Sequence, residues 1–205
     1  LVGSEMCIRD RLTGWVLYAS MGVDAADFWA QYDHMYIPEL GHNVSVTDYA
    51  HTLYIRASWT DFNPQEDVYG WKIDSNLRAY IEGAYQRNMR LAFRVVVDSR
   101  DKRTEFTPQF VKDAGAKGFM NKGKWSPYSD DPVFQKYYTK FVKALAKDFN
   151  DPSKVEFIDG FGLGKWGEYH TMIYSTGDDT PKKAVFDWVT DIYSQAFDKV
   201  PVVIN

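Results

Sequence analysis

The sequence is poor in the residues that cross-link a chain or hold a metal ion. Among its 205 residues there are 1 cysteine, Cys7, and 4 histidines. A lone cysteine excludes an internal disulfide framework. No second histidine or cysteine stands at ligand spacing from His170, and a metal site of that kind needs several such side chains. We therefore expect no bound metal, and the motifs of the chain call for no cofactor.

The chain also lacks an excess of positive charge and any long apolar run. Its formal net charge is −4, so it has no basic surface of the kind that binds nucleic acid. No apolar stretch approaches the roughly 20 residues that a membrane-spanning helix needs. We expect no nucleic-acid partner and no membrane span, and the sequence leaves the oligomeric state open.

Hydrophobic and aromatic residues, in contrast, are plentiful. They make up 45% and 17% of the chain, which is enough to build one core in a single domain or in part of one. Two explanations of the aromatic content stay open. The rings pack a bulky core, or they form flat surfaces that stack on the apolar faces of sugars.

The first eleven residues differ from the rest of the chain. Residues 1–11 (LVGSEMCIRDR) contain no apolar segment of a signal peptide and do not continue into the pattern of strands and helices. They resemble translated read-through of a sequencing adapter, as found at the ends of metagenomic reading frames. We expect a non-native leader over 1–11 and one domain over 12–205, with the natural N-terminus missing.

Apolar runs and amphipathic helices alternate along the rest of the chain. The apolar runs predict strands at 15–20, 51–59, 91–97, 155–161 and 201–204. The periodicity and capping residues predict helices after Asp24, at 74–88, from Asp131-Pro132 onward, at 180–198, and over a short turn that Thr107 caps. The rest of 98–131 is expected to be irregular. This alternation indicates an α/β fold with a parallel sheet.

The spacing of the predicted strands indicates a barrel. Their starts lie roughly 47 residues apart, so eight such units would need roughly 370 residues, within the range of elaborated (β/α)8 barrels. We expect a partial (β/α)8 TIM barrel, with strands 1 to about 5 present and the C-terminal strands missing. The carboxyl ends of barrel strands carry active sites, so polar residues at those ends are the candidate functional residues.

One of these strand ends presents a carboxylate among aromatic side chains. The fourth predicted strand runs into GLGKWGEYH, residues 162–170. Glu168 is placed to act as a general acid/base that protonates a glycosidic oxygen and then activates water. Trp166 and Tyr169 would desolvate it and stack on sugar, and His170 would hydrogen-bond it or a substrate hydroxyl. The alternative is a structural glutamate that holds a glycine-rich loop.

The glycines of this loop also fit a different pattern. Residues 162–167 match G-x-G-x-x-G, which binds a dinucleotide when a helix opens at the glycines and an acidic residue ends the next strand. Here HTMIYSTG and a loop come next, and Asp187 and Asp191 fall in a predicted helix. A nucleotide-binding enzyme is therefore the weakest of the hypotheses.

Several other residues at the same predicted face are candidates for substrate binding. Trp59, Trp125 and Tyr128 would serve as sugar platforms or would equally well pack the loops. Asp98 ends the third strand and Asp159 lies in the fourth, where ligand binding and structural hydrogen bonding both stay open.

A charged residue stands inside the second predicted strand. Because a lone buried charge is very costly, Arg56 must have a partner. The run after this strand, from Pro64 to Trp71, is expected mainly to build the turn into the next helix.

Taken in order, these segments resemble a known family. From about Gly14 onward the chain resembles the bacterial glycoside-hydrolase-like barrels known as domain of unknown function 4832. Those barrels are called β-galactosidase-like and are related to glycoside hydrolase family 42, in the clan of Glu/Glu retaining enzymes. The resemblance rests on Gly14–Tyr18, Arg56–Trp71, Leu91–Val95, Asp131–Phe134 and Gly164–His170.

The resemblance assigns roles to single residues. It implies that Glu168 is the acid/base carboxylate and that Arg56 points inward to hold a catalytic carboxylate. Asn63 departs from the pattern, since those families often have glutamate before the proline, and Trp125 matches no position of it. The resemblance also implies a secreted protein, periplasmic or extracellular, whose substrate is an oligo- or polysaccharide.

Three functions remain in order of preference: a glycoside hydrolase, a non-catalytic carbohydrate-binding barrel, and a nucleotide-dependent enzyme. In the resembled clan the nucleophilic glutamate comes from the seventh strand, beyond this chain, and a retaining mechanism needs two carboxyl groups about 5 Å apart. We therefore expect residues 12–205 to be inactive alone. The sugar, the linkage and the stereochemical outcome stay open.

Overall fold

The computed structural model describes residues 12, 14–19, 21–100 and 104–204; the predicted leader, with Cys7, lies outside the described residues. The described chain forms a five-stranded parallel sheet in the order β1-β4-β5-β8-β9. Its strands are β1 (Trp15–Tyr18), β4 (Ala50–Ser58), β5 (Arg90–Val96), β8 (Val155–Gly160) and β9 (Val202–Ile204). All five predicted strands are present, and the predicted α/β class is confirmed.

The middle of the sheet is buried and its two outer strands are not. In β5 the residues Leu91–Val96 are all buried, as expected of a parallel strand covered on both faces. In β1, by contrast, Trp15, Val16 and Tyr18 are exposed, and so is Ile204 in β9. Within the described residues the sheet therefore ends in two open edges.

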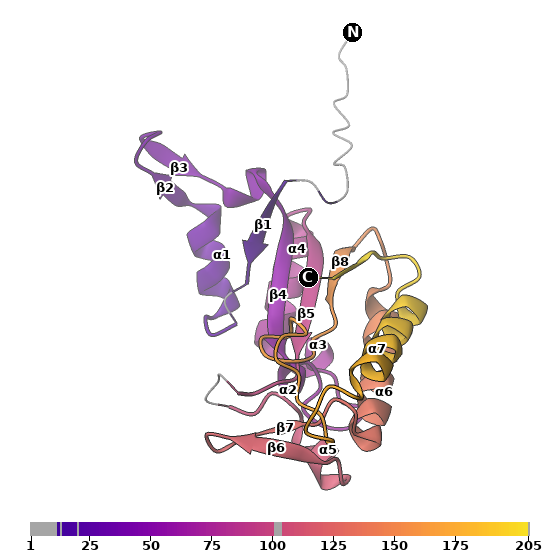
Figure 1. Cartoon of the computed structure of the whole chain (residues 1–205). Helices are drawn as coiled ribbons and strands as arrows, with labels where there is room; N and C mark the ends of the chain where they lie inside the picture. Colours follow the sequence, from indigo (N-terminus) through magenta and orange to yellow (C-terminus); the bar gives the residue numbers. More distant parts are fainter. Residues whose placement is uncertain (1–11, 13, 20, 101–103, 205) are drawn as a thin grey trace.

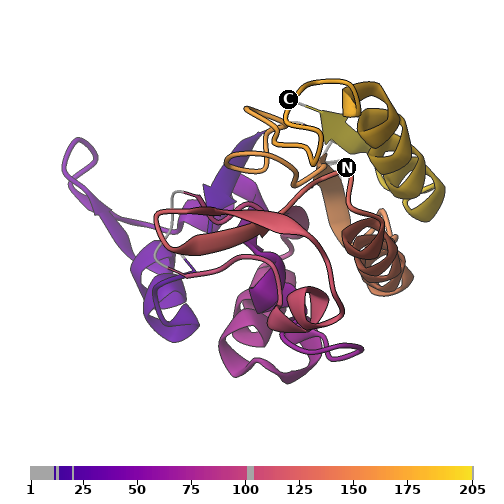
Figure 2. The same cartoon turned by 60° about the horizontal axis from the view of Figure 1, so that its bottom comes forward.

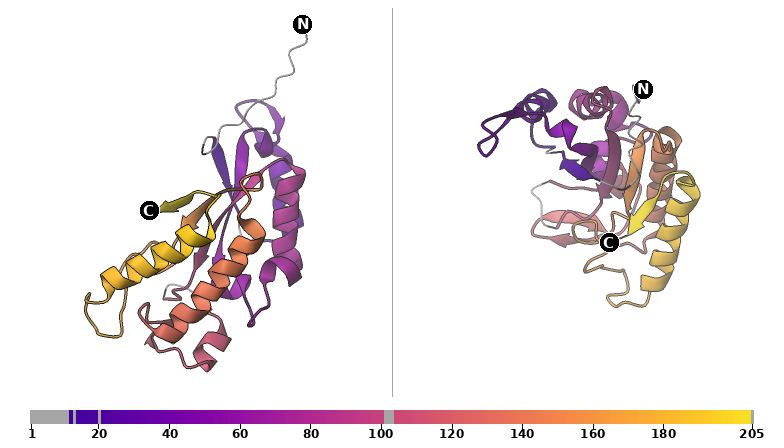
Figure 3. Two further views of the ribbon diagram at one scale, coloured as in Figure 1. Left: turned by 90° about the vertical axis from the view of Figure 1, so that its right-hand side faces the viewer. Right: turned by 90° about the horizontal axis from the view of Figure 1, so that it is seen from above.

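Four longer helices lie around the outer side of the curved sheet (Figure 1, Figure 3). They are α1 (Ala25–Asp33), α4 (Ser75–Gln86), α6 (Pro132–Phe149) and α7 (Lys182–Ala196). Each of the first three begins after an aspartate whose side chain accepts a backbone N–H of the first turn: Asp24, Asp74 and Asp131. Such caps satisfy amide groups that the helix itself leaves unpaired.

An aromatic core lies between α6 and the carboxyl end of β4. Trp59 opens the short helix α2 (Trp59–Phe62) and is fully buried. Its indole ring meets Phe134, Tyr138 and Phe141 of α6 at centroid distances of 6.0, 5.1 and 5.7 Å. The high aromatic content thus serves core packing in this part of the fold.

The structure contains elements that the sequence pattern did not reveal. Two antiparallel hairpins lie outside the parallel sheet: β2 (Met35–Ile37) with β3 (His42–Val44), and β6 (Gly118–Asn121) with β7 (Lys124–Pro127). The short helices η1 (Val46–Asp48) and α3 (Gly70–Ile73) were not predicted either, whereas α5 (Gln109–Asp113) is the short helix expected after Thr107.

The predicted cap of the short helix is wrong. The Thr107 hydroxyl does not cap α5 but donates to the carbonyl oxygen of Val97, at 2.9 Å. It therefore ties α5 to the end of β5, and α5 begins at Gln109.

The connections that leave the strands gather at one end of the sheet. Figure 2 brings this end forward and shows the β6–β7 hairpin and the loop between β8 and α7 lying over it. None of the described helices has the length and apolar character to cross a membrane. The candidate site is built at this end.

Candidate active site

The loop after β8 owes its path to glycines. Gly162, Gly164 and Gly167 all have positive φ, at +75°, +72° and +75°, a region that other residues adopt only with strain. At Gly162 a Cβ would stand 1.8 Å from the carbonyl oxygen of Val95. The loop therefore packs directly on the β5 backbone and turns Glu168 back over the end of the sheet.

Glu168 is held by an arginine of the neighbouring strand. Arg94 lies in the middle of β5 with a side chain only 5% exposed, and its Nη1 is 2.8 Å from Oε1 of Glu168. The Glu168 side chain is 39% exposed, so one oxygen is fixed by an ion pair while the carboxylate still reaches solvent. Such a charge-assisted hydrogen bond defines where the carboxylate sits.

The same guanidinium holds a second carboxylate, Asp159 of β8. Nη2 and Nε of Arg94 lie 2.7 and 3.0 Å from Oδ2 of Asp159, and the Tyr54 hydroxyl donates to the same oxygen at 2.5 Å. Burial lowers the pKa of Arg94, but the hydrogen bonds to Asp159 and Glu168 outweigh it and raise that pKa overall. Burial is the main cause of a raised pKa at Tyr54, and the hydrogen bond to Asp159 is the second. The hydroxyl group therefore stays protonated and can donate.

Arg56 has a main-chain oxygen as its hydrogen-bond partner among the described residues. Its Nη2 donates to the main-chain oxygen of Trp166 at 2.8 Å, and its Nε is buried without a hydrogen-bond partner among the described residues. Glu168 is held by Arg94 and not by Arg56. Arg56 thus fixes the backbone of the Glu168 loop, and its predicted catalytic role stays a prediction.

These side chains surround an open hollow of about 390 Å³ at the carboxyl ends of the strands. Its lining residues come from three strands and from the loop after β8: Tyr18, Tyr54, Arg56, Arg94, Trp166 and Glu168. A second hollow of about 460 Å³ adjoins it and shares Tyr18 and Arg56. The two together form a polar, aromatic-edged groove beside Glu168.

The aromatic residues next to Glu168 lie in different surroundings. Trp166 is exposed, with His170 stacked on it at 5.5 Å and the Lys165 ammonium 4.2 Å from the ring centroid. Tyr169 turns the other way: its hydroxyl donates to the Lys182 carbonyl oxygen at 3.0 Å. Of the predicted aromatic platforms in this loop, Trp166 is the one that lines the hollow.

Asp98 is engaged in structural contacts. Its carboxylate pairs with Arg100, at 2.6 Å from Nη2 to Oδ2, and accepts from the Ser126 hydroxyl at 3.4 Å. Nη2 of Arg100 also donates to the Thr171 carbonyl oxygen at 2.7 Å. This cluster ties β7 and the loop after β8 to the end of β5, which is the structural alternative left open for Asp98.

The three other predicted platforms lie away from the hollow. Trp59 belongs to the aromatic core against α6. Trp125 is buried in the β6–β7 hairpin, where the Lys112 ammonium is 5.5 Å from its ring centroid. Tyr128 is half-buried against Phe119, with ring centroids 5.8 Å apart. Packing of the core and loops accounts for all three.

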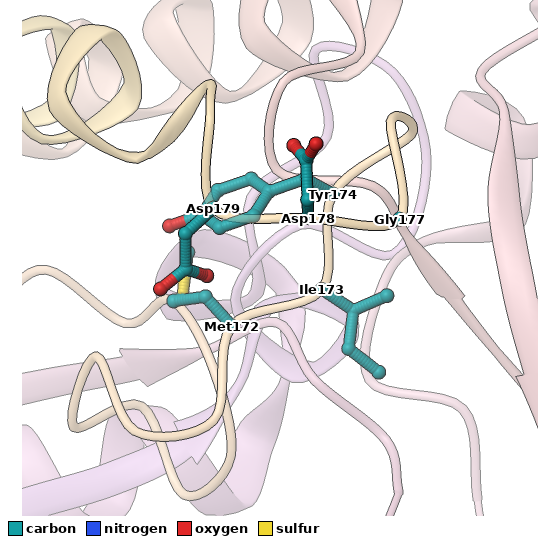
Figure 4. Close-up of a pocket in the computed structure, with 6 residues that line it drawn as sticks. All are labelled: Met172, Ile173, Tyr174, Gly177, Asp178 and Asp179. Carbon is teal, nitrogen blue, oxygen red and sulfur yellow. The ribbon is translucent and has the colours of Figure 1, made fainter.

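A smaller hollow lies within the loop between β8 and α7 (Figure 4). It holds about 130 Å³ and shares no lining residue with the groove beside Glu168. Its two carboxylates are Asp178 and Asp179, and hydrogen bonds from Thr180 lower the pKa of Asp178. Within the described ranges, no three histidine, cysteine, aspartate or glutamate side chains gather as a metal site.

The glycine pattern of residues 162–167 has a structural explanation. The residues after Gly164 form turns and an isolated bridge between Lys165 and His170, and the next described helix is α7, which begins at Lys182. The helix N-terminus that a dinucleotide site requires is therefore not formed at these glycines. They serve close packing of the loop instead.

Comparison with known proteins identifies the fold. No family model matches the sequence, and no curated protein matches it. Three similar solved structures are the exo-β-1,4-mannosidase Op5Man5 from Opitutaceae bacterium strain TAV5, a GH5_18 protein from Streptomyces cattleya, and endo-glycoceramidase II from Rhodococcus sp.. Their TM-scores are 0.56, 0.57 and 0.54, at 15%, 13% and 15% identity.

The alignments cover most of this chain and less than half of each neighbour. They span 92%, 95% and 88% of this chain but 31%, 45% and 43% of those chains. At this level of identity the likeness concerns the fold. The parallel sheet and its outer helices match part of a TIM barrel of the kind found in glycoside hydrolases.

Proposed function

We propose that this chain is the N-terminal part of a glycoside hydrolase barrel in which Glu168 is the general acid/base. The observation that carries the proposal is the placement of Glu168. It lies after β8, beside a polar groove, with one oxygen fixed by Arg94. Active sites of (β/α)8 barrels lie at this end of the strands, and the similarity to glycoside hydrolase barrels supports the same reading.

In this proposal the two oxygens of Glu168 have different tasks. Oε1 is bound to Arg94, while Oε2 has no hydrogen-bond partner among the described residues and is the oxygen left to carry a proton. In the first half of the reaction that proton passes to the glycosidic oxygen as the bond to the anomeric carbon breaks. In the second half the carboxylate takes a proton from water.

A second carboxylate must come from elsewhere. Among the described residues, the one other carboxylate held at this place is Asp159, and Arg94 and Tyr54 occupy its Oδ2. A retaining glycosidase needs its two carboxyl groups about 5 Å apart and both free to react. We therefore propose that residues 12–205 are inactive alone, which agrees with their partial coverage of the neighbours.

The lack of a free second carboxylate in the described chain also favours an alternative function. A barrel with the same groove but no nucleophile would bind carbohydrate without cleaving it. In both cases the ligand is an oligo- or polysaccharide, with Trp166 and His170 as its aromatic contacts. We also propose that the chain is related to domain of unknown function 4832 and to glycoside hydrolase family 42. The periplasmic or extracellular location is likewise part of the proposal.

The test uses the protein expressed from its complete reading frame, assayed on aryl glycosides with good and poor leaving groups. Glu168→Gln should lower kcat/KM by about 10²–10⁴-fold on poor leaving groups, the usual contribution of a general acid, and much less on dinitrophenyl glycosides, which depart without a proton. Glu82→Gln, on the exposed face of α4, is the matched control. Unchanged turnover of poor leaving groups by Glu168→Gln would remove Glu168 from the mechanism, and no turnover by the wild-type protein together with sugar binding would establish the alternative.

A further inference from the structure

The Arg94 guanidinium is shared between two carboxylates of unequal burial. Glu168 takes Nη1, whereas Asp159 takes both Nη2 and Nε. The Asp159 side chain is 10% exposed and the Glu168 side chain 39%. The buried carboxylate thus holds the larger share of the cation, and the more exposed one holds the remainder.

This arrangement answers a chemical difficulty in the proposed mechanism. A guanidinium beside a carboxylate favours its ionised form and lowers its pKa. A general acid must instead be protonated when substrate binds. Arg94 alone would therefore position Glu168 well and at the same time deprive it of its proton.

We propose that Asp159 is a positioning residue that offsets the charge of Arg94, so that Arg94 can orient Glu168 without fixing it as a carboxylate. The inference rests on the proposed function of Glu168. Asp159 acts through Arg94 and does not touch the substrate. Tyr54 supports it, because its hydroxyl donates to Oδ2 of Asp159 and stabilises the negative charge there.

Other charged or titratable groups face Glu168 from the surrounding elements. Tyr18 of β1 and Arg56 of β4 line the same hollow. Lys165 and His170, on the Glu168 loop itself, both lie against Trp166. Among the described residues, no hydrogen bond or ion pair joins Tyr18, Arg56 or His170 to Arg94 or Asp159, so substitutions at Asp159 leave the hydrogen bonds of these three residues in place.

Asp159→Asn is a suitable probe because its shape is conserved. The amide oxygen can replace Oδ2 and still accept from Arg94 and Tyr54. The amide nitrogen then replaces Oδ1, which is buried without a hydrogen-bond partner among the described residues, so it meets no opposing donor. The substitution removes the charge and keeps the acceptor.

The experiment is a carbon-13 NMR titration of the Glu168 carboxyl in the 205-residue chain, with the resonance assigned by its loss in Glu168→Gln. In Asp159→Asn the midpoint should fall by about one pH unit, a tenfold loss of proton affinity. In Tyr54→Phe the midpoint should rise by a smaller amount. Without the hydrogen bond from Tyr54, Asp159 interacts more strongly with Arg94, so the guanidinium stabilises the Glu168 carboxylate less. Asp187→Asn, an exposed position on α7, should leave the midpoint unchanged.

An unchanged or higher midpoint in Asp159→Asn would overturn the inference. If that variant does not fold, an unchanged or lower midpoint in Tyr54→Phe would overturn it equally. In the complete protein, Asp159→Asn should also move the alkaline limb of kcat/KM to lower pH, since activity is lost as the acid deprotonates. The titration needs no turnover, so an unshifted midpoint alongside an inactive Glu168→Gln would remove this inference and leave the proposed function standing.

Discussion

Arg56 and Arg94 are register partners on the adjacent parallel strands β4 and β5, and both side chains line the hollow beside Glu168. Like charges side by side on one face of a sheet destabilise it. The structure compensates by giving Arg94 two carboxylates and Arg56 a carbonyl oxygen. The site is therefore assembled around two cations, one neutralised and the other held by a main-chain dipole.

Removing the positive charge of Arg94 should lower the stability of the fold. Arg94→Met leaves Asp159 buried without its counter-ion, and breaking such a pair from one side costs about 3–5 kcal/mol. We expect urea denaturation to show a loss of that size. Arg94→Met combined with Asp159→Asn should recover much of it, since the unpaired charge is gone. Equal stabilities of the single and double variants would contradict a buried ion pair here.

The glycine at the start of the Glu168 loop should tolerate no side chain. Gly162→Ala combines a positive φ with a Cβ 1.8 Å from the Val95 carbonyl oxygen, and we expect a loss of about 3 kcal/mol or more. Gly177→Ala is the matched control, because its φ is +77° but nothing lies within 4 Å of the added Cβ. It should cost about 1–2 kcal/mol, the conformational part alone. Comparable melting temperatures of the two variants would show that the close approach to β5 is not formed.

The ion pair between Asp33 of α1 and Arg87 at the end of α4 should make the free energy of unfolding depend on pH. Hydrogen bonding to Arg87, with its positive charge, holds the pKa of Asp33 below its usual range, and Nε of Arg87 is 2.7 Å from Oδ1. A carboxyl with a depressed pKa stabilises the fold above its unfolded pKa and loses that effect as pH falls. The free energy of unfolding of the wild type should therefore drop more than that of Asp33→Asn as pH decreases from about 5 through about 3. Parallel pH profiles would exclude the pair as a source of stability.

Sugar binding in the groove should depend on Trp166. Titration with mannobiose, cellobiose or xylobiose should quench its fluorescence, and Trp166→Ala should weaken the binding of whichever sugar binds by about 10-fold or more, as lost aromatic contacts in a binding site commonly do. Trp15→Ala is the control, because that indole is also exposed but does not line the hollow. Equal losses in both variants would move the binding surface away from Glu168.

The sheet could be predicted because buried parallel strands appear in the sequence as continuous apolar runs. All five appear within two residues of their predicted limits, and the capping aspartates mark the helices. The two hairpins escaped prediction because their strands have only three or four residues each. Too few positions alternate between buried and exposed to show a period.

The site was predicted in part for a related reason. A charged residue inside an apolar strand needs a partner, and this argument singled out Arg56. The same argument applies to Arg94, in the apolar run LAFRVVV. That signal was present and points to the residue that actually holds Glu168. The inward direction of Asp159 was beyond prediction, since a one-residue shift in register would turn it to the opposite face.

The order of strands in the sheet has a consequence for how the chain is made. Each strand pairs with the sheet strand synthesised just before it, so β4 docks on β1, β5 on β4, β8 on β5 and β9 on β8. Each pairing joins strands that a whole crossover connection separates, and such non-local pairing of parallel strands is slower than the formation of local contacts. Once β1 and β4 have left the ribosome, their edge is available for pairing with β5. The groove around Glu168 forms only after β8 and the loop that follows it have left the exit tunnel.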